Sequence, residues 1–281
     1  MSCQAKRCCV FLLIANISRT DSVATWRVFS VSLFVVLLAL VSQSTRVSAA
    51  EPTIRIAAAS SLQFALNEII DEYGQTHKEV NIQAVYGSSG NLYRQIVQGA
   101  PFDLFLSADA SLIDKLHETG VAADAGNAFG QGQLVLAVSQ RDAKLTSADE
   151  ILGSLQAQSR SFRLAIANPA HAPYGKAAKQ YLQSIQQWSH IKSALVYGEK
   201  VSQAAQFVTS GAVDAGIISL SLAQALGLPH VLIDRRHYQP ILHKMTRLSE
   251  ETHTADLYEY LSTSKAVAEV FEKYGYLTTS R

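Results

Sequence analysis

The chain has 281 residues, of which 48% are hydrophobic, and its 24 Lys and Arg residues nearly balance 23 Asp and Glu residues to a net charge of +1. This length is enough for two domains of ordinary size, each able to bury a core without disulfide bonds. The balanced charge argues against the strongly basic class of nucleic-acid-binding proteins.

The first 50 residues have the pattern of a secretory leader. An uninterrupted run of apolar residues and serines over 29–41 follows Arg27 and precedes small residues that end at Ala49 and Ala50. Because this run is too short for a comfortable membrane span, we predict a signal peptide over 1–50, cleaved after Ala49 or Ala50. An uncleaved anchor is the alternative. We therefore expect the protein to be periplasmic.

The composition changes once this segment is removed. All three cysteines (Cys3, Cys8 and Cys9) lie in 1–50, so we expect neither disulfides nor thiol chemistry in the exported part. Five basic residues and one acidic residue also lie there, which leaves 19 basic and 22 acidic residues in 51–281, a net charge of −3. This mildly acidic charge argues against nucleic acid or an anionic membrane as a partner.

From residue 53 onward, strand-like and helix-like patterns alternate. The strand-like runs are 53–59, 80–86, 103–107, 133–138, 163–167, 194–197, 215–219 and 230–233. The helix-like runs are 62–77, 91–98, 110–119, 176–187, 202–209, 255–261 and 265–274. This alternation predicts an α/β fold with parallel sheets that are covered by helices on both faces.

No linker rich in Pro, Gly or Ser divides the chain, so we expect two lobes between which the chain crosses more than once. The candidate crossovers are 130–132 and 235–239. They place residues 51–132 and 238–281 in lobe one and residues 133–237 in lobe two. Ligands of such folds lie at the carboxyl ends of strands, where helices begin.

Four strand-to-helix turns are rich in hydrogen-bond donors. They are residues 57–62 (AAASSL), 87–90 (GSSG), 168–175 (NPAHAPYG) and 198–202 (GEKVS). A helix start has unpaired N–H groups and a positive dipole end, which together favour an anion. The GSSG turn contains no Lys or Arg, so neutral donors would hold an anion there. Each turn alone also fits ordinary helix capping, since serine is a common cap.

The ordered set of motifs is more specific than any one turn. The set comprises AAASSL (57–62), GSSGNL (87–92), GAPFDLFLSAD (99–109), NPAHAPYGKAA (168–178), GEKVSQA (198–204), DAGIIS (214–219) and FEKYGYL (271–277). In this order the chain resembles the periplasmic molybdate-binding proteins, which are the soluble receptors of molybdate ABC importers. The resemblance implies a two-lobed type II periplasmic-binding-protein fold, with a ligand cleft between the lobes and two crossover strands.

The resemblance also implies the ligand-binding residues. Ser61 and Ser89 would donate hydroxyl and backbone hydrogen bonds from lobe one, and the backbone N–H groups of Tyr174 and Val201 would donate from lobe two. Ser60 is a further candidate donor, because members of the family differ at this turn.

One position departs from the family pattern. Some members have a tyrosine whose hydroxyl contacts the oxyanion, and Ser219 stands at that position in this chain. This departure puts Ser219 in doubt as a ligand. It makes Tyr174, in the turn 168–175, the alternative source of a phenolic donor, and the sequence leaves open which of the two hydroxyls contacts the ligand.

We therefore expect a monomeric receptor that binds molybdate and tungstate and delivers them to a membrane permease with its ATPase, with no cofactor and no enzymatic activity. These dianions offer only acceptors, so a site of N–H and O–H donors satisfies each of their oxygens. Molybdenum, as molybdate, is the only metal that we expect at these residues. The alternatives are a receptor for another tetrahedral oxyanion, such as sulfate, and an enzyme on the same two-lobed fold.

Patterns for other chemistry are weak. None of the eight histidines stands in an H-x-x-x-H or H-E-x-x-H motif. The turn 87–90 is not the G-x-S-x-G elbow of a serine hydrolase. Asp103 and Asp109 flank a predicted strand, and an aspartate at a strand end is more often a helix cap than a catalytic acid.

Overall fold

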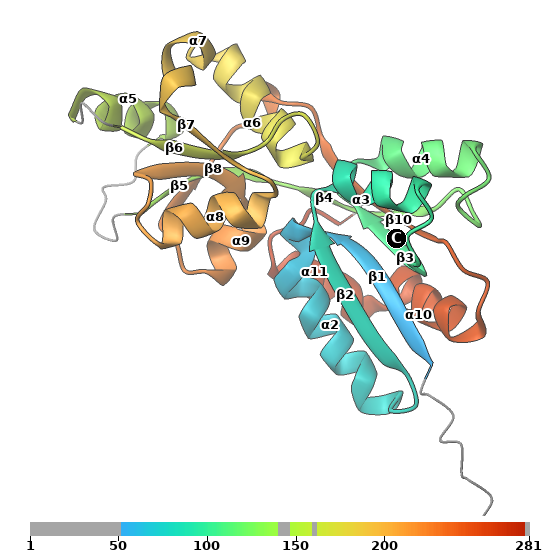
Figure 1. Cartoon of the computed structure of the whole chain (residues 1–281). Coiled ribbons are helices and arrows are strands. Elements are labelled where there is room, and N and C mark those ends of the chain that lie inside the picture. The colour runs from blue at the N-terminus through green and yellow to red at the C-terminus, as the bar shows by residue number, and fades with distance from the viewer. Residues whose placement is uncertain (1–51, 140–146, 159–161, 279–281) are drawn as a thin grey trace, which may run out of the picture. The chain divides into compact units, whose positions relative to one another are not determined.

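The computed structural model of the chain describes residues 52–139, 147–158 and 162–278, and the predicted signal peptide over 1–50 lies outside them (Figure 1). None of the helices in these ranges is both long and apolar enough to span a bilayer.

Two five-stranded sheets organise the described residues. Sheet A has the order β2 (Asn81–Gly87), β1 (Thr53–Ala59), β3 (Leu104–Ser107), β10 (Ile241–Arg247) and β4 (Asn127–Gly132). Sheet B has the order β7 (Leu195–Gly198), β6 (Leu164–Ala167), β8 (Ala215–Ser219), β5 (Leu134–Val138) and β9 (His230–Leu232). The strands β3, β5, β6 and β8 are almost wholly apolar and buried, as strands covered on both faces require.

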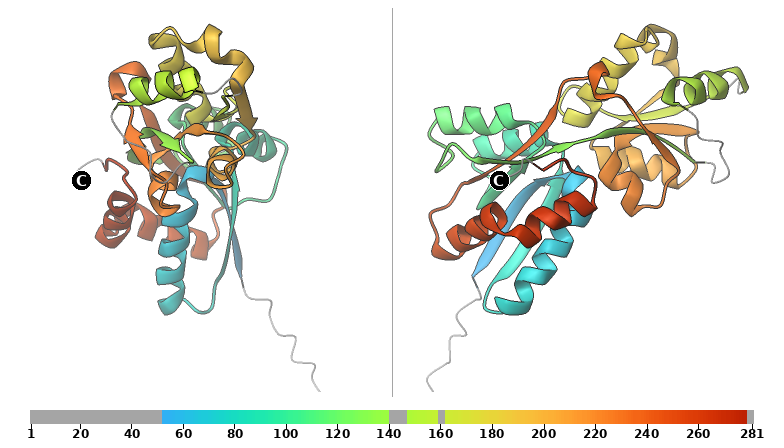
Figure 2. Two further views of the ribbon diagram at one scale, coloured as in Figure 1. Left: turned by 90° about the vertical axis from the view of Figure 1, so that its left-hand side faces the viewer. Right: turned by 180° about the vertical axis from the view of Figure 1, so that it is seen from behind.

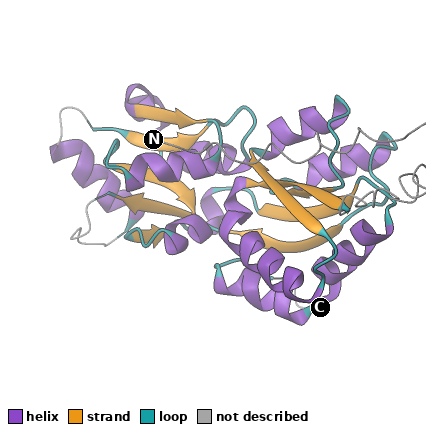
Figure 3. Cartoon of the chain, turned by 60° about the horizontal axis from the view of Figure 1, so that its bottom comes forward, coloured by secondary structure: helices purple, strands orange, loops and turns teal. Residues whose placement is uncertain are grey.

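Helices cover both faces of the sheets (Figure 3). Those that follow or flank the strands of sheet A are η1 (Ser60–Leu62), α2 (Gln63–Thr76), α3 (Ser89–Val97), α4 (Ala110–Glu118), α10 (Thr252–Thr263) and α11 (Lys265–Lys273). Those between the strands of sheet B are α5 (Ala148–Gln158), α6 (Pro173–Ser184), α7 (Trp188–Ile191), η2 (Lys192–Ala194), α8 (Val201–Thr209) and α9 (Leu220–Ala225), and η3 (Arg235–His237) follows β9. Helical periodicity produces their buried faces: α8, for example, buries Val201, Ala204, Ala205 and Val208.

The expectation of purely parallel sheets is wrong for one strand in each sheet. β1 runs parallel to β2 and β3, and β6 runs parallel to β7 and β8. β10 is antiparallel to β3 and β4, and β5 is antiparallel to β8 and β9. The chain enters sheet B through β5 and returns to sheet A through β10, in both cases directly from the other sheet. These two connections therefore lack the crossover helix that joins parallel strands within one sheet.

The two passages between the sheets lie side by side. The chain leaves sheet A at Gly132 and enters sheet B at Leu134, and it returns between β9 and Ile241, which pairs with Gly132 (Figure 2). Leu134 in turn pairs with Ser219, the last residue of β8. The carboxyl edges of the two sheets therefore meet at these passages, which fall where the sequence predicted the crossovers.

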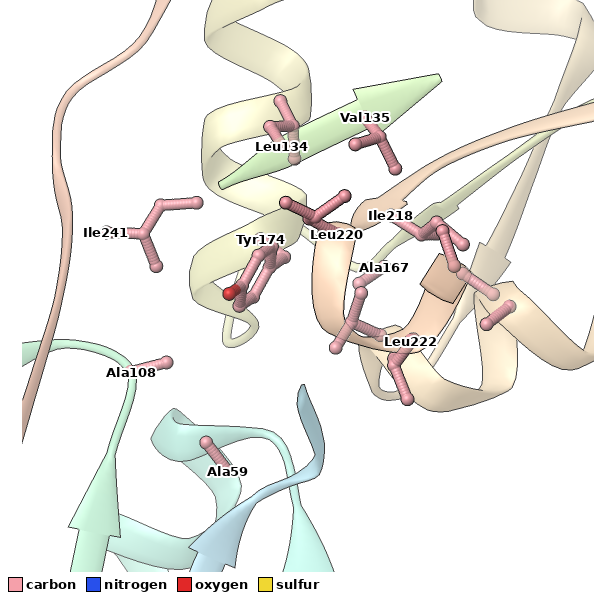
Figure 4. Close-up of a cluster of buried hydrophobic side chains, with 14 of the residues drawn as sticks. Ala59, Ala108, Leu134, Val135, Ala167, Tyr174, Ile218, Leu220, Leu222 and Ile241 are labelled. Carbon is pink, nitrogen blue, oxygen red and sulfur yellow. The ribbon is translucent and has the colours of Figure 1, made fainter. Parts of the chain in front are cut away.

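A shared hydrophobic core occupies this junction. Figure 4 shows Tyr174 of α6 projecting between Leu220 of sheet B's helix α9 and Ala108 at the end of β3, with Ile241 beside it. The α/β fold class is thus confirmed. The exact limits of the two lobes, 51–132 with 238–281 and 133–237, remain a proposal.

Candidate functional site

The turn after β1 places two serines in a buried 3-10 turn. Ser60 and Ser61 are both 2% exposed, and neither caps the following helix, because the cap positions are Ala59 and Leu62 without side-chain bonds. The Ser60 hydroxyl instead accepts a hydrogen bond from the N–H of Ser202 in α8, at 3.4 Å. Helix capping therefore does not explain why these two polar side chains are buried at this turn.

The Ser61 backbone is held from two sides. Its carbonyl accepts hydrogen bonds from the hydroxyls of Ser221 and Tyr276, both at 2.8 Å. Its own hydroxyl lies 3.4 Å from Nε2 of His243, a fully buried residue of β10. These contacts hold η1 against α9, β10 and the C-terminal segment.

The turn after β2 presents Ser89 at the first position of α3. Ser89 is fully buried, and its hydroxyl accepts a hydrogen bond from the N–H of Ala108 at 3.0 Å. Ser88 occupies the N-cap position but makes no capping bond, and its hydroxyl contacts Nδ1 of His171 at 2.9 Å. The Ser89 hydroxyl therefore keeps its proton available for an acceptor.

The turn after β6 brings Tyr174 to the first turn of α6, which starts at Pro173, three residues before the helix-like run predicted from residue 176. The Tyr174 side chain is buried, yet its hydroxyl has no hydrogen-bond partner in the part of the chain that the structure describes. Burial raises the pKa of this phenol well above its ordinary value, and the neighbouring Tyr276 raises it further. A neutral O–H without a partner in a buried place is a donor that awaits an acceptor.

The turn after β7 leads to Val201, the first residue of α8. Its N-cap residue Lys200 makes no capping bond, so the Val201 N–H has no partner within its own helix. The Lys200 ammonium donates to the carbonyl of Tyr86 at 2.9 Å. This contact ties α8 to the end of β2.

These four turns line one small cavity of about 10 Å³, with room for about one water molecule. Its lining residues are Ala59, Ser60, Ser61, Gly87, Ser88, Ser89, Ala108, Ala172, Pro173, Tyr174 and Val201. All five residues that the sequence predicted as ligand contacts are among them, and no lining residue carries a charge. Ser219 is not among them, because its hydroxyl accepts from the Leu222 N–H as the cap of α9.

His171 closes one rim of the cavity. Its carbonyl accepts from the Gly90 N–H at 3.0 Å, and its Nδ1 contacts Ser88. Its Nε2 lies 3.3 Å from the carboxylate of Glu199, a largely exposed side chain outside the cavity lining. The start of α3 and the loop before α6 are therefore bonded across the rim.

Comparison with known proteins assigns the chain to a family. The model of the family "Bacterial extracellular solute-binding protein" matches residues 54–277. The chain belongs to the bacterial extracellular solute-binding proteins. These proteins carry solutes for transport, and the family is not one of enzymes.

Several solute-binding proteins are similar over most of their length. A molybdate-binding protein of Azotobacter vinelandii is 32% identical over 258 residues, covering 88% of this chain and 98% of that protein. A putative ABC transporter substrate-binding lipoprotein of Bacillus subtilis is 32% identical over 242 residues, covering 84% and 90%. The solved periplasmic molybdate-binding protein of Azotobacter vinelandii superposes with a TM-score of 0.72 at 26% identity, covering 81% of this chain and all of that one. The resemblance predicted from the motifs is confirmed.

Other chemistry finds little support in the described residues. They contain no group of three or more His, Cys, Asp or Glu side chains that could hold a metal ion. Asp109 caps α4 by accepting from the N–H and hydroxyl of Ser111, as predicted, and Asp103 accepts from the N–H of Arg55.

Sequence reasoning missed the residues behind the lining. His243, Ser221 and Tyr276 contact Ser61 from β10, α9 and the segment after α11. They are 182, 160 and 215 positions away from Ser61 in the chain. No local motif marks them, although Tyr276 falls inside one of the quoted matching blocks.

Proposed function

We propose that this chain is an extracytoplasmic receptor that binds molybdate, and tungstate with it, and delivers the oxyanion to a membrane permease driven by an ATPase. The observation that carries the proposal is the uncharged cavity at four strand-to-helix turns, lined by Ser60, Ser61, Ser89, Tyr174 and Val201. The names of the relatives from Azotobacter vinelandii support molybdate as the ligand. The predicted signal peptide over 1–50 supports export to the periplasm.

The donor set suits a tetrahedral dianion. Each helix start stabilises an anion by up to about 2 kcal/mol in partly buried geometry. Each hydrogen bond to a charged partner adds about 1.5–3 kcal/mol, and although the contributions do not simply add, they allow sub-micromolar affinity. Molybdate is fully deprotonated at neutral pH, so it needs no acceptor from the protein, and the lining offers no carboxylate that would repel it.

Selection among oxyanions would follow size. Sulfate has the same charge and the same tetrahedral arrangement of acceptors as molybdate, but it is smaller. A site that closes with its donors spaced for the larger anion would leave sulfate with longer and weaker hydrogen bonds.

The test is a melting panel on the exported protein, purified after its own processing, with molybdate, tungstate, sulfate and phosphate. At a thousandfold excess over Kd, a ligand stabilises the folded state by about 4 kcal/mol, which raises Tm by roughly 8–16 °C for a protein of this size. We expect such a shift with molybdate and tungstate and little shift with sulfate or phosphate. An equal shift with sulfate would identify a sulfate receptor instead, and no shift with any oxyanion would refute the proposal.

A further inference from the structure

His243 lies directly behind the oxyanion cavity and is the one fully buried histidine in the described part of the chain. It sits in the middle of β10, where the pairing with β4 shifts register. Its ring packs against the rings of Tyr276 at 5.0 Å, Phe129 at 5.8 Å and Tyr174 at 6.2 Å between centroids. Packing in an aromatic cluster does not require the two ring nitrogens of a histidine. The hydrogen-bond partners of these nitrogens therefore indicate what the imidazole does at this position.

The two nitrogens of His243 have different partners. Nδ1 lies 3.1 Å from the carbonyl oxygen of Ile241, and Nε2 lies 3.4 Å from the hydroxyl of Ser61. A carbonyl only accepts, so Nδ1 carries a proton in the neutral ring and Nε2 is an acceptor. Desolvation lowers the pKa of His243 to about 4, so the ring is neutral in the ligand-free protein near pH 7. The Ser61 hydroxyl must therefore donate to His243.

This arrangement gives Ser61 the wrong polarity for a dianion. While its proton points to Nε2, the hydroxyl presents lone pairs to the cavity, and a fully deprotonated oxyanion offers only acceptors. Turning the hydroxyl proton toward the anion would leave Nε2 as a buried acceptor without a partner, which is costly. A proton on Nε2 removes the conflict, because Nε2 then donates to Ser61 and Ser61 donates to the anion.

We propose that His243 is the positioning residue that sets the direction of the Ser61 hydroxyl, and that a dianion enters the cavity together with one proton, which His243 takes up from solvent. This inference rests on the proposed oxyanion-binding function. No bond between heavy atoms is made or broken: a proton from solvent forms the Nε2–H bond, the Ser61 hydroxyl proton turns from Nε2 toward the anion, and the bound site gains one positive charge next to the dianion.

None of the described side chains around the His243 ring is charged, so a bound anion would be the charged group that interacts with this ring. Ser61 faces it from η1, Phe129 and Gly132 from β4, Tyr174 from α6 and Tyr276 from the C-terminal segment. The two phenols are the titratable groups among these, and burial keeps both neutral by raising their pKa. Only desolvation and the Ile241 carbonyl shift the pKa of His243, with no carboxylate or cation contributing. A dianion on the cavity side of Ser61 would thus raise the pKa of His243, since no other charged group of the described residues shifts this pKa.

The first test uses the unmodified protein. Isothermal titration with micromolar molybdate at pH 6 in two buffers of different ionisation enthalpy reports the protons taken up per anion bound. We expect uptake approaching one proton, and a Kd that falls by up to about tenfold for each pH unit between 7.5 and 5.5. Tight binding with zero proton uptake and a flat pH profile would overturn the inference and leave the proposed function intact. No binding at any pH would instead refute the proposed function.

Two variants locate the proton. His243→Gln keeps a polar group near Ser61 but cannot be protonated, so we expect it to bind molybdate without proton uptake and with a flat pH profile. His171→Gln is the matched control, because it removes the imidazole that contacts Ser88 at the cavity rim and leaves His243 unchanged, and we expect it to keep the pH slope. The reverse result, with the slope lost in His171→Gln and kept in His243→Gln, would overturn the assignment. If His243→Gln does not fold, the ring shifts of His243 in ¹⁵N-histidine spectra of the unmodified protein, with and without molybdate, decide the question.

Discussion

Tyr174 and Ser89 both face the cavity, but their hydroxyls differ in the ligand-free protein. The Ser89 oxygen accepts from the Ala108 N–H, and this bond fixes the oxygen while leaving the hydroxyl proton free. The Tyr174 hydroxyl has no partner in the described residues. A buried polar group without a partner costs about 1–3 kcal/mol, so the free protein is less stable than its packing alone would make it. Such a cost is typical of a group whose partner is the ligand.

Replacing Tyr174 by Phe tests this difference. The change removes an unsatisfied hydroxyl and no hydrogen bond, so we expect an unchanged or higher Tm without ligand, together with molybdate affinity weakened by about tenfold. Tyr276→Phe is the matched control: its hydroxyl donates to the Ser61 carbonyl, so the ligand-free protein should lose stability. Calorimetric titration and melting of both variants check the pair. An unchanged Kd for Tyr174→Phe would show that the phenol does not contact the anion.

Ser89→Ala should weaken molybdate binding by about tenfold or more, because one hydrogen bond to a charged ligand is lost. It should also lower stability, since the buried Ala108 N–H loses its acceptor. Ser219→Ala controls for this second effect: it removes an equally buried hydroxyl that accepts from the Leu222 N–H, away from the cavity lining. We expect a comparable drop in Tm but an unchanged Kd for Ser219→Ala. Equal losses of affinity in both variants would mean that the effect is general destabilisation.

At the scale of elements, the site depends on where strands end and helices begin. Five residues of the site stand in the first turn of the helix that follows a strand of sheet A or B. They are Ser60, Ser61, Ser89, Tyr174 and Val201. Their N–H groups and hydroxyls converge because the carboxyl edges of both sheets meet at the crossovers. The lining side chains are neutral, and the helix starts themselves supply partial positive charge.

The start of α3 allows a test of the rim contact. A Cβ on Gly90 would lie 2.7 Å from the backbone oxygen of His171, so Gly90→Ala must push α3 and the loop before α6 apart. We expect clearly weaker molybdate binding, although alanine is the better helix former. Gly74→Ala is the matched control: it lies inside α2 with nothing within 4 Å of the added Cβ, and it should stabilise the protein by about 0.5–1 kcal/mol with Kd unchanged. Normal affinity in Gly90→Ala would show that the rim contact is not needed for binding.

The sequence predicted most of these elements, and its misses have physical causes. β1 and β8 have the predicted bounds, because their apolar runs stop at clear turn residues. β4 was missed since two glycines weaken its strand pattern, and β10 because His243 and Lys244 interrupt its apolar positions. α9 follows β8 without a break, so one apolar run hides two elements. The four turns were predicted from local motifs, whereas the contacts of His243 and Tyr276 with Ser61 depend on tertiary pairing that no local pattern encodes.

At the scale of the whole described chain, two sheets are joined by two adjacent passages, near Gly132 and near Ile241. The cavity at this junction holds about one water molecule, and hydrogen bonds cross its rim from Gly90 to His171 and from Lys200 to Tyr86. A tetrahedral oxyanion is larger than the one water molecule for which this cavity has room. We therefore expect its entry to need separation of the elements around sheet A from those around sheet B, with the two passages as the hinge.

This requirement predicts a measurable opening in the ligand-free protein. Small-angle scattering of the exported protein should give a smaller radius of gyration with saturating molybdate than without it, and sulfate at the same concentration should have no such effect. Hydrogen exchange provides a local readout: the Gly90 N–H, which is bonded to His171 across the rim, should exchange more slowly when molybdate is bound. Ile69 is fully buried in the middle of α2, away from the cavity lining, so the exchange of its N–H controls for general stabilisation. Compaction without protection at Gly90 would place the closing contact elsewhere. If neither signal changes while molybdate binds tightly, the anion must enter by side-chain motion alone, and the passages would not act as a hinge.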